Sequence, residues 1–256
     1  MEYKNIYYTS NTDIYRSLDI FVPENTNDST PVFIYFHGGG LESGSKEEIP
    51  YKCFIENNVC VVSINYRMYP YCRYPDYIWD CALGVKWVTE HIEQYANVSG
   101  VFIGGTSAGA YIAMMLCFDR KYLTVCSVDF SKIAGFVFNA GQPTTHFNIL
   151  RERGVNPLKC VVDEAAPLYH IDEYNNQPPM LIFCADNDMV NRYEQIQLLI
   201  GTLKCMNYPD ENIYFELVRG HCHCDYIEND NLFAEKIIRF IIKTINRNGN
   251  VNKLSN

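Results

Sequence analysis

The chain has 256 residues, of which 48% are hydrophobic, so it can bury a large core in one domain or two. Its formal net charge is −9 with acidic and basic residues interspersed, which argues against a surface that binds nucleic acid. The polar N-terminus lacks the apolar core of a signal peptide, and no apolar run approaches the ~20 residues that span a bilayer, so we expect a soluble, cytoplasmic chain without a membrane segment.

The cysteine content is high for an intracellular chain, with eleven residues, most of them inside apolar runs where cysteine behaves as a small buried hydrophobe. The sequence contains no Cys-x-x-Cys pair. Cys222 and Cys224 alternate with His221 and His223, but ligands this close together cannot close a tetrahedral zinc site without distant partners. We therefore predict neither a metal nor a cofactor.

The first half of the chain reads as strands followed by helices. Alternating apolar and polar residues around 18–22 predict antiparallel edge strands, and residues 25–30 predict a polar turn. Continuous apolar runs over 31–36 and 59–65 predict buried strands, with a helical patch near 47–57 between them. Residues 75–95 predict a long helix whose first turn holds Pro75.

The second half continues this alternation. Strands are predicted over 101–104, 133–139, 179–184 and 213–218, with helices over 110–116, 191–206 and 231–245, and a frayed tail over 246–256. Such alternation indicates the α/β class, with a mostly parallel sheet covered by helices on both faces. Without repeats or low-complexity segments, residues 1–256 are expected to form one domain.

The connection over residues 141–177 is too long for a plain link between two strands. It contains a helical patch near 147–153 and three prolines. A connection of this length is usually functional, so we predict a cap or lid that forms part of the substrate wall. An ordinary helix with a long loop is the alternative.

The pentapeptide Gly105-Thr106-Ser107-Ala108-Gly109 joins a short apolar strand to a helix-prone run. A serine between two glycines in this context is typical of a nucleophile elbow. The turn is so tight that a side chain at Gly105 or Gly109 would collide with the neighbouring strand or helix. The same turn directs the Ser107 hydroxyl outward and places the Ala108 N–H at a helix N-terminus, where it can donate to an anion.

A second glycine motif, His37-Gly38-Gly39-Gly40, follows the buried strand over 31–36. In open α/β sheets, ligands bind outside the carboxyl ends of the strands. Three successive glycines leave backbone N–H groups bare there, as an oxyanion hole requires.

With both motifs in this order and context, the chain resembles the α/β-hydrolase superfamily, in particular its serine esterases. The resemblance runs from Asp19 to about Ile245. Residues 65–67, 74–76 and Asp80 are similar to the stretch after the third strand in bacterial acetyl and feruloyl esterases. It implies an α/β-hydrolase fold, a triad in the order Ser, Asp, His, and oxyanion donors at Gly39, Gly40 and Ala108.

The acid and the base of this triad each have two candidates. Asp186 and Asp188 follow the strand over 179–184, and a family pattern similar to Gly-x-x-Asp favours Asp188, while Asp186 is expected to cap the turn through its own backbone. His221 and His223 follow the strand over 213–218. A pattern similar to Gly-x-x-His favours His223, whereas a Gly-His pattern would select His221. His37 is expected to orient the glycine loop.

The resemblance implies hydrolysis of carboxylic esters with short or carbohydrate-linked acyl groups, through an acyl-enzyme on Ser107 and without a cofactor. The expected partner is a small-molecule ester, and the oligomeric state is not readable from the sequence. Two alternatives stay open. One is an amidase such as an arylformamidase, and the other is a catalytically inactive hydrolase fold that serves as a binding protein.

Overall fold

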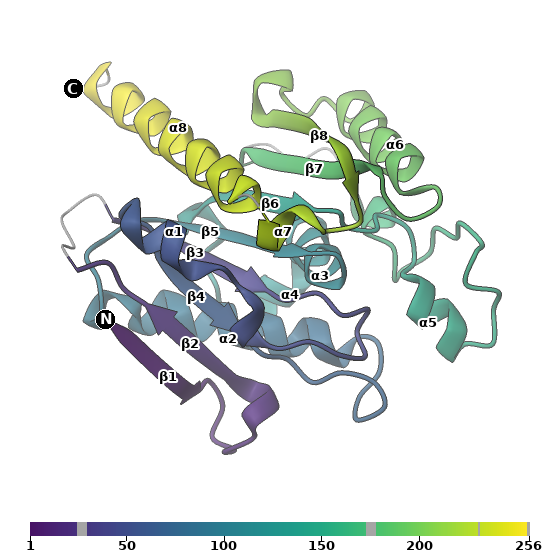
Figure 1. Ribbon diagram of the computed structural model, residues 1–256, viewed down its shortest axis with the longest axis horizontal. Coiled ribbons are helices and arrows are strands. Elements are labelled where there is room, and N and C mark those ends of the chain that lie inside the picture. Colours follow the sequence, from purple (N-terminus) through teal and green to yellow (C-terminus); the bar gives the residue numbers. More distant parts are fainter. Residues whose placement is uncertain (25–29, 173–177, 230, 255–256) are drawn as a thin grey trace.

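The computed structural model describes residues 1–24, 30–172, 178–229 and 231–254. The strands in these ranges form one eight-stranded sheet in the order β1-β2-β4-β3-β5-β6-β7-β8 (Figure 1). The strands are β1 (Glu2–Tyr7), β2 (Ser17–Phe21), β3 (Thr30–Phe36), β4 (Cys60–Ile64), β5 (Val98–Thr106), β6 (Ile133–Asn139), β7 (Met180–Asn187) and β8 (Ile213–Cys222).

The pairing of the strands confirms the predicted sheet. β1 pairs with β2, and β2 with β4, in antiparallel fashion. From β4 to β8 every pairing is parallel. The carboxyl ends of β3, β5, β6, β7 and β8 therefore meet at one edge of the sheet, where an α/β protein binds its ligand.

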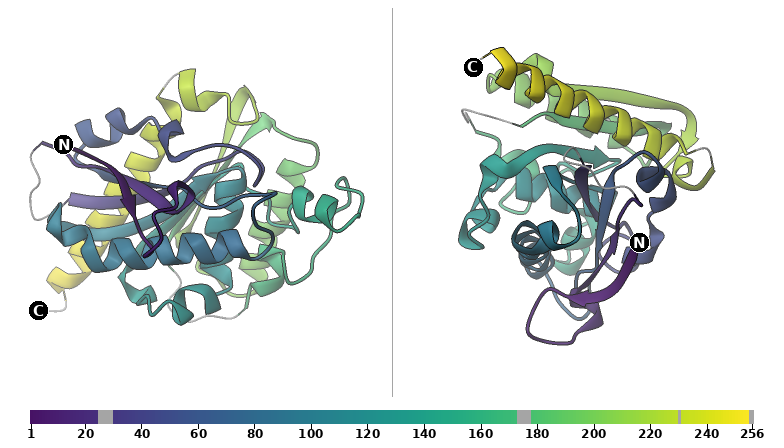
Figure 2. Two further views of the ribbon diagram at one scale, coloured as in Figure 1. Left: turned by 90° about the horizontal axis from the view of Figure 1, so that it is seen from below. Right: turned by 90° about the vertical axis from the view of Figure 1, so that its left-hand side faces the viewer.

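Helices cover both faces of the sheet, because the strands alternate their apolar side chains between two cores. On β3, Val32 and Ile34 face one core and Phe33 and Tyr35 the other. Figure 2 shows α2 and α8 on opposite faces. The helices are α1 (Tyr51–Glu56), α2 (Asp76–His91), α3 (Ala108–Phe118), α4 (Lys121–Val125), α5 (Phe147–Glu152), α6 (Arg192–Cys205), α7 (Tyr226–Asn229) and α8 (Leu232–Leu254).

Helix α8 differs from its prediction, which ended the helix at residue 245 and left a frayed tail. The helix continues to Leu254, so the predicted tail is wrong up to that residue. Arg247 anchors the start of this extension, because its guanidinium donates to the Glu211 carbonyl at 3.2 Å and to Asn212 Oδ1 at 2.9 Å. Such partners, 35 residues or more away along the chain, are not visible in the local pattern.

Three predicted features lie wholly or partly outside the described residues. They are positions 25–29 of the polar turn, 173–177 of the long connection and 255–256 of the tail. Within the described helices, none combines the length and apolar composition needed to cross a bilayer.

Candidate active site

Three side chains from separate loops meet at the carboxyl edge of the sheet. Ser107 follows β5, Asp188 follows β7 and His223 follows β8. The Ser107 Oγ lies 2.9 Å from His223 Nε2, and His223 Nδ1 lies 2.5 Å from Asp188 Oδ1. The Asp188 side chain is only 1% exposed, whereas that of His223 is 25% exposed. The imidazole thus bridges a buried carboxylate and a hydroxyl that opens to a cleft.

The elbow holds Ser107 in a strained backbone conformation, with φ of 54° and ψ of −111°. Its N–H donates to the Asn139 carbonyl at 2.8 Å, and α3 begins at the next residue. A Cβ at Gly109 would lie 2.0 Å from the Phe36 carbonyl oxygen, and one at Gly105 would lie 2.4 Å from the Gly109 carbonyl carbon. The prediction that side chains would collide at both glycines is confirmed.

Gly109→Ala is therefore expected to destabilise the fold by more than about 3 kcal/mol, because the clash is with backbone that cannot move aside. Gly201, inside α6, is the matched control, since a Cβ there meets nothing within 4 Å. Gly201→Ala should raise stability by about 0.5–1 kcal/mol through its better helix propensity. Urea unfolding of both variants measures the difference, and equal stabilities would contradict the elbow geometry.

The other carboxylate and histidine candidates have different partners. Asp186 Oδ1 accepts the N–H groups of Gly220 at 2.8 Å and His221 at 3.3 Å, and the Gly220 amide is the main reason that the pKa of Asp186 is lowered. Asp186 thus stabilises the end of the neighbouring strand β8, not only its own turn as predicted. His221 Nδ1 lies 2.9 Å from Asp225 Oδ1. Neither side chain belongs to the hydrogen-bonded chain of Ser107.

The histidines and cysteines at the end of β8 and just after it do not gather around a common point. His223 and His221 contact different carboxylates, Asp188 and Asp225. In the part of the chain that the structure describes, no group of three or more His, Cys, Asp or Glu side chains is placed to hold a metal ion.

The glycine loop, residues 37–45, lies beside the Ser107 hydroxyl. Gly39 and Gly40 have φ of 95° and 66°, and a Cβ at Gly39 would lie 2.0 Å from the Ser43 carbonyl oxygen. Only glycine fits this conformation without strain. The loop borders a cleft of about 620 Å³. The cleft is lined by Tyr35, Gly38, Gly39, Gly40, Glu48, Thr106, Ser107, Phe147, Met189, His223, Cys224, Asp225 and Ile227.

His37, the first residue of the glycine loop, packs its buried side chain against Tyr66. Its ring is buried and stacks on Tyr66 at 4.3 Å between centroids, and its Nδ1 lies 2.8 Å from the Gly38 carbonyl. The Tyr66 hydroxyl donates to the His37 carbonyl at 2.8 Å. Burial lowers the pKa of His37 to about 4, so the ring is neutral at neutral pH.

This low pKa predicts a loss of stability in mild acid. The unfolded chain has a histidine pKa near 6.5, so between about 6.5 and 4 it binds a proton that folded His37 does not. The stabilisation is present above pH 6.5 and falls by about 2 kcal/mol between pH 7 and pH 5. Urea unfolding of wild type and His37→Gln at both pH values tests this. Buried His146 contributes to the acid loss of stability in both proteins, so the difference between them reports on His37. An equal loss of stability in the two proteins would contradict the prediction.

Helix α5 of the long connection packs against the glycine loop. Asn148 Nδ2 donates to the Gly40 carbonyl, and Arg151 Nη1 lies 3.1 Å from Glu42 Oε1. Phe147 lines the cleft. In Figure 1 the segment with α5 projects beyond one end of the sheet. The connection therefore contributes Phe147 to the lining of the cleft and contacts the glycine loop at Gly40.

A buried polar network beside the elbow was not predicted from the sequence. The Tyr226 hydroxyl donates to Asn139 Oδ1, and Asn139 Nδ2 donates to Thr106 Oγ1 at 3.2 Å. Asn139, at the end of β6, is fully buried. An amide at the end of a buried strand is the signal that could have identified it, since buried polar groups need partners. The network joins the ends of β5 and β6 to α7.

The motif residues after β4 have structural partners. The Arg67 guanidinium donates two hydrogen bonds to the Asp80 carboxylate, at 2.7 Å and 2.9 Å, and its backbone N–H donates a third at 3.2 Å. Arg16 Nε adds a fourth at 3.1 Å. Asn65 Oδ1 accepts the N–H of Lys46 at 2.7 Å. These residues fix the loops around the site without lining the cleft.

Comparison with known proteins was made by sequence and by structure. The BD-FAE family matches residues 18–203. Probable carboxylesterase 7 of Arabidopsis thaliana is 34% identical over 136 residues, which cover 47% of this chain and 43% of that protein. Kynurenine formamidase of Salmo salar is 34% identical over 101 residues, which cover 39% of this chain and 33% of that protein. The match thus spans less than half of each relative.

Among solved structures, a truncated carbohydrate esterase from gut microbiota superimposes with a TM-score of 0.76 at 17% identity, covering 96% of both chains. At this identity the likeness shows the fold alone. The fold is that of the α/β-hydrolases, as the order of motifs implied. Since the family match covers most of the chain, this protein belongs to the BD-FAE family of α/β-hydrolases.

Proposed function

We propose that this protein is a serine hydrolase of carboxylic esters, with Ser107 as nucleophile, His223 as general base and Asp188 as the acid that orients the histidine. The observation that carries the proposal is the unbroken chain of hydrogen bonds from Ser107 Oγ through His223 to Asp188. The family match and the carboxylesterase relatives support the same reaction class.

The first half of the reaction transfers the acyl group to the enzyme. With its proton on Nδ1, His223 donates to Asp188 and accepts the Ser107 proton at Nε2 as Oγ attacks the ester carbonyl. The carbonyl oxygen becomes an oxyanion. When the C–O bond to the alcohol breaks, Nε2–H protonates the leaving alkoxide and an acyl-Ser107 ester remains.

The second half returns the enzyme to its starting state. A water molecule gives its proton to His223 Nε2 while its oxygen attacks the acyl carbonyl. The second oxyanion collapses, the acid leaves, and Ser107 Oγ recovers the proton from the imidazolium. Asp188 stays ionised throughout and stabilises the imidazolium at 2.5 Å. The reaction uses no cofactor.

The oxyanion donors in this proposal are the backbone N–H groups of Gly39, Gly40 and Ala108. Gly39 and Gly40 border the cleft beside Ser107, and Ala108 opens helix α3, whose N-terminal partial positive charge favours an anion. One such donor contributes about 3–4 kcal/mol of transition-state stabilisation in other hydrolases.

The cleft suggests a neutral substrate. Its described lining contains two carboxylates, those of Glu48 and Asp225, and no Lys or Arg. An ester with an anionic acyl group would be repelled by these carboxylates. We propose short or carbohydrate-linked neutral acyl esters, in keeping with the carbohydrate esterase that shares the fold.

We propose that residues 1–256 form a single domain. In it, the long connection over residues 141–177 forms one wall of the substrate site. Its support is the packing of α5 on the glycine loop through Asn148 and Arg151, and the position of Phe147 in the cleft.

A cytoplasmic location is the final part of the proposal. All eleven cysteines lie in the described residues and are free thiols. Free thiols in this number fit a reducing compartment, because oxidising compartments favour disulfides.

An arylformamidase is the second candidate, favoured by the kynurenine formamidase relatives. The same side chains would serve, with His223 protonating an amine as the leaving group.

One substrate screen separates these candidates. Purified protein is assayed on p-nitrophenyl acetate, p-nitrophenyl hemisuccinate, an acetylated xylo-oligosaccharide, methyl ferulate and formanilide. We expect acetate to be cleaved with a kcat/KM at least about tenfold above hemisuccinate, because the cleft repels the anion. Cleavage of formanilide alone would favour the amidase. If no ester or amide is hydrolysed by the folded protein, the proposed function is wrong and a binding protein is favoured.

A further inference from the structure

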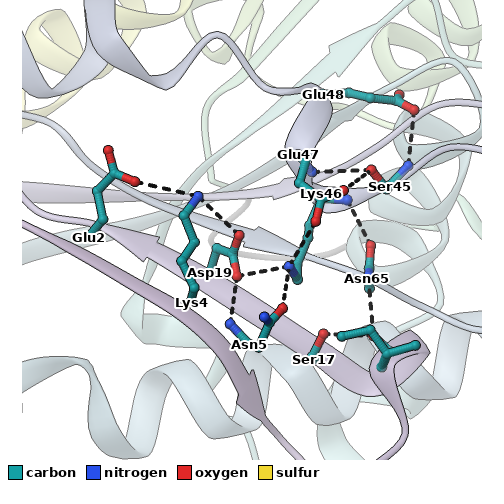
Figure 3. Close-up of polar contacts among 11 residues, drawn as sticks. Glu2, Lys4, Asn5, Ser17, Asp19, Ser45, Lys46, Glu47, Glu48 and Asn65 are labelled. Carbon is teal, nitrogen blue, oxygen red and sulfur yellow. Dashed lines mark hydrogen bonds and ion pairs between the residues drawn. The ribbon is translucent and has the colours of Figure 1, made fainter.

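A buried ion pair lies where the glycine loop returns to the sheet. Lys46 follows the loop directly and opens the short 3₁₀ helix Lys46–Glu48. Its ammonium lies 2.9 Å from Asp19 Oδ1 on β2 and donates to Asn5 Oδ1 at 2.9 Å (Figure 3). The side chains of Lys46 and Asp19 are each 1% exposed.

Burial of this pair is not needed to fill a core. Removing two charges from water is costly, and apolar side chains of similar volume often stabilise such a position as well or better. A buried pair can instead specify one geometry out of several. The feature that Lys46 and Asp19 could specify is the path of the chain between Gly40 and the 3₁₀ helix.

The backbone of Lys46 is fixed to the same region of the sheet. Its N–H donates to Asn65 Oδ1 at 2.7 Å, and the Asn65 N–H donates to the Ser17 carbonyl at 2.9 Å. Ser45 and Glu48 cap the 3₁₀ helix with reciprocal hydrogen bonds. Both the backbone and the side chain of Lys46 thus contact residues of β1 and β2 and the residue that follows β4.

On the other side of Lys46, the loop is folded tightly on itself. The N–H groups of Glu42 and Ser43 donate to the Gly39 carbonyl at 3.1 Å and 3.0 Å. A Cβ at Gly44 would lie 2.6 Å from His37 Nδ1 and 2.8 Å from the Gly38 carbonyl oxygen. With no spare room in the turn, a shift of Ser45–Lys46 passes on to Gly38, Gly39 and Gly40.

We propose that Lys46 and Asp19 form a positioning pair, which holds the glycine loop so that the N–H groups of Gly39 and Gly40 face the oxyanion formed at Ser107. This inference rests on the proposed function. Neither residue lines the cleft, so the pair acts through the loop and not on the substrate.

The test compares Lys46→Met with the double variant Asp19→Asn/Lys46→Met, because the single variant leaves the buried Asp19 carboxylate with only one of its two ammonium partners, Lys4 Nζ at 3.2 Å. For both variants we expect kcat on p-nitrophenyl acetate to fall about 10–100-fold with KM within about twofold. The reason is that a misplaced oxyanion donor reduces the stabilisation of the transition state and leaves substrate binding unchanged. Lys52→Met, at an exposed site on α1, is the control and should keep wild-type values.

A second measurement follows the loop itself. Hydrogen–deuterium exchange of the peptide that contains residues 37–45 should be at least about tenfold faster in the double variant than in wild type or Lys52→Met, as expected when a local tether is lost. A double variant with wild-type kcat, or with unchanged exchange in this peptide, would overturn the proposal. If wild type hydrolyses no substrate, the proposed function fails, and the exchange alone decides whether the pair holds the loop.

Discussion

Ser107→Ala is expected to lower kcat/KM on p-nitrophenyl acetate by about 10³–10⁶-fold while the protein stays folded. The variant removes the Oγ that lies 2.9 Å from His223 Nε2, and no acyl-enzyme can form without it. The loss has an upper bound because the proposed oxyanion donors and substrate binding would still accelerate attack by water. The strained backbone at residue 107 is set by its neighbours, so alanine neither relieves nor worsens it.

The matched control for this variant is Ser131→Ala, at an exposed serine before β6 that does not line the cleft. It should keep kcat/KM within about twofold, as exposed substitutions usually do. Initial rates and unfolding midpoints are both measured for wild type and the two variants. If Ser107→Ala kept more than a tenth of wild-type activity, Ser107 would not be the nucleophile.

The fold and the elbow could be predicted because their signals are local. Continuous apolar runs and their alternation with helices identified the parallel sheet, whose pairing from β4 to β8 the structure confirms. The need for glycine at positions 105 and 109 follows from the tight strand-to-helix turn alone. Contacts with the backbone at 2.4 Å and 2.0 Å confirm it.

The choice between near neighbours rested on family patterns, which favoured Asp188 and His223, and not on a local physical signal. Asp186 lies at the end of β7 and Asp188 follows that strand, and only the folded structure shows that Asp186 accepts amides of β8 while Asp188 contacts His223. The roles of these residues in catalysis stay a prediction. The helix beyond residue 245 was missed for a similar reason, since Arg247 depends on residues 211 and 212.

Polar residues that act from inside the protein were also missed. Lys46 lies in the charged segment Lys46-Glu47-Glu48, at the start of the patch predicted as helical, yet its side chain is buried against Asp19. Lysine is almost never fully buried unless paired, and its partner here is 27 residues earlier in the chain. Composition and periodicity cannot reveal a pairing of this kind.

His223→Ala is expected to lower kcat/KM by at least about 10⁴-fold, whereas His221→Ala should change it by less than about fivefold. The two histidines are two residues apart, with His221 near the end of β8 and His223 just after it, so each variant controls for disturbance of this segment by the other. His223 contacts Ser107 Oγ through Nε2, while His221 contacts Asp225, which follows β8. The base must lie within hydrogen-bond reach of the proton that it removes. In this structure His223 lies within that reach of the Ser107 hydroxyl.

The two aspartates provide the same contrast for the acid. Asp188→Asn should lower kcat by about 10⁴-fold, because the amide cannot stabilise the imidazolium and favours the wrong tautomer. In Asp186→Asn, the side-chain oxygen can still accept the Gly220 and His221 amides, so kcat should stay within about threefold. If the large losses fell on Asp186 and His221 instead, the loops after β7 and β8 would have to rearrange before catalysis. The hydrogen-bonded chain through His223 would then describe a resting state.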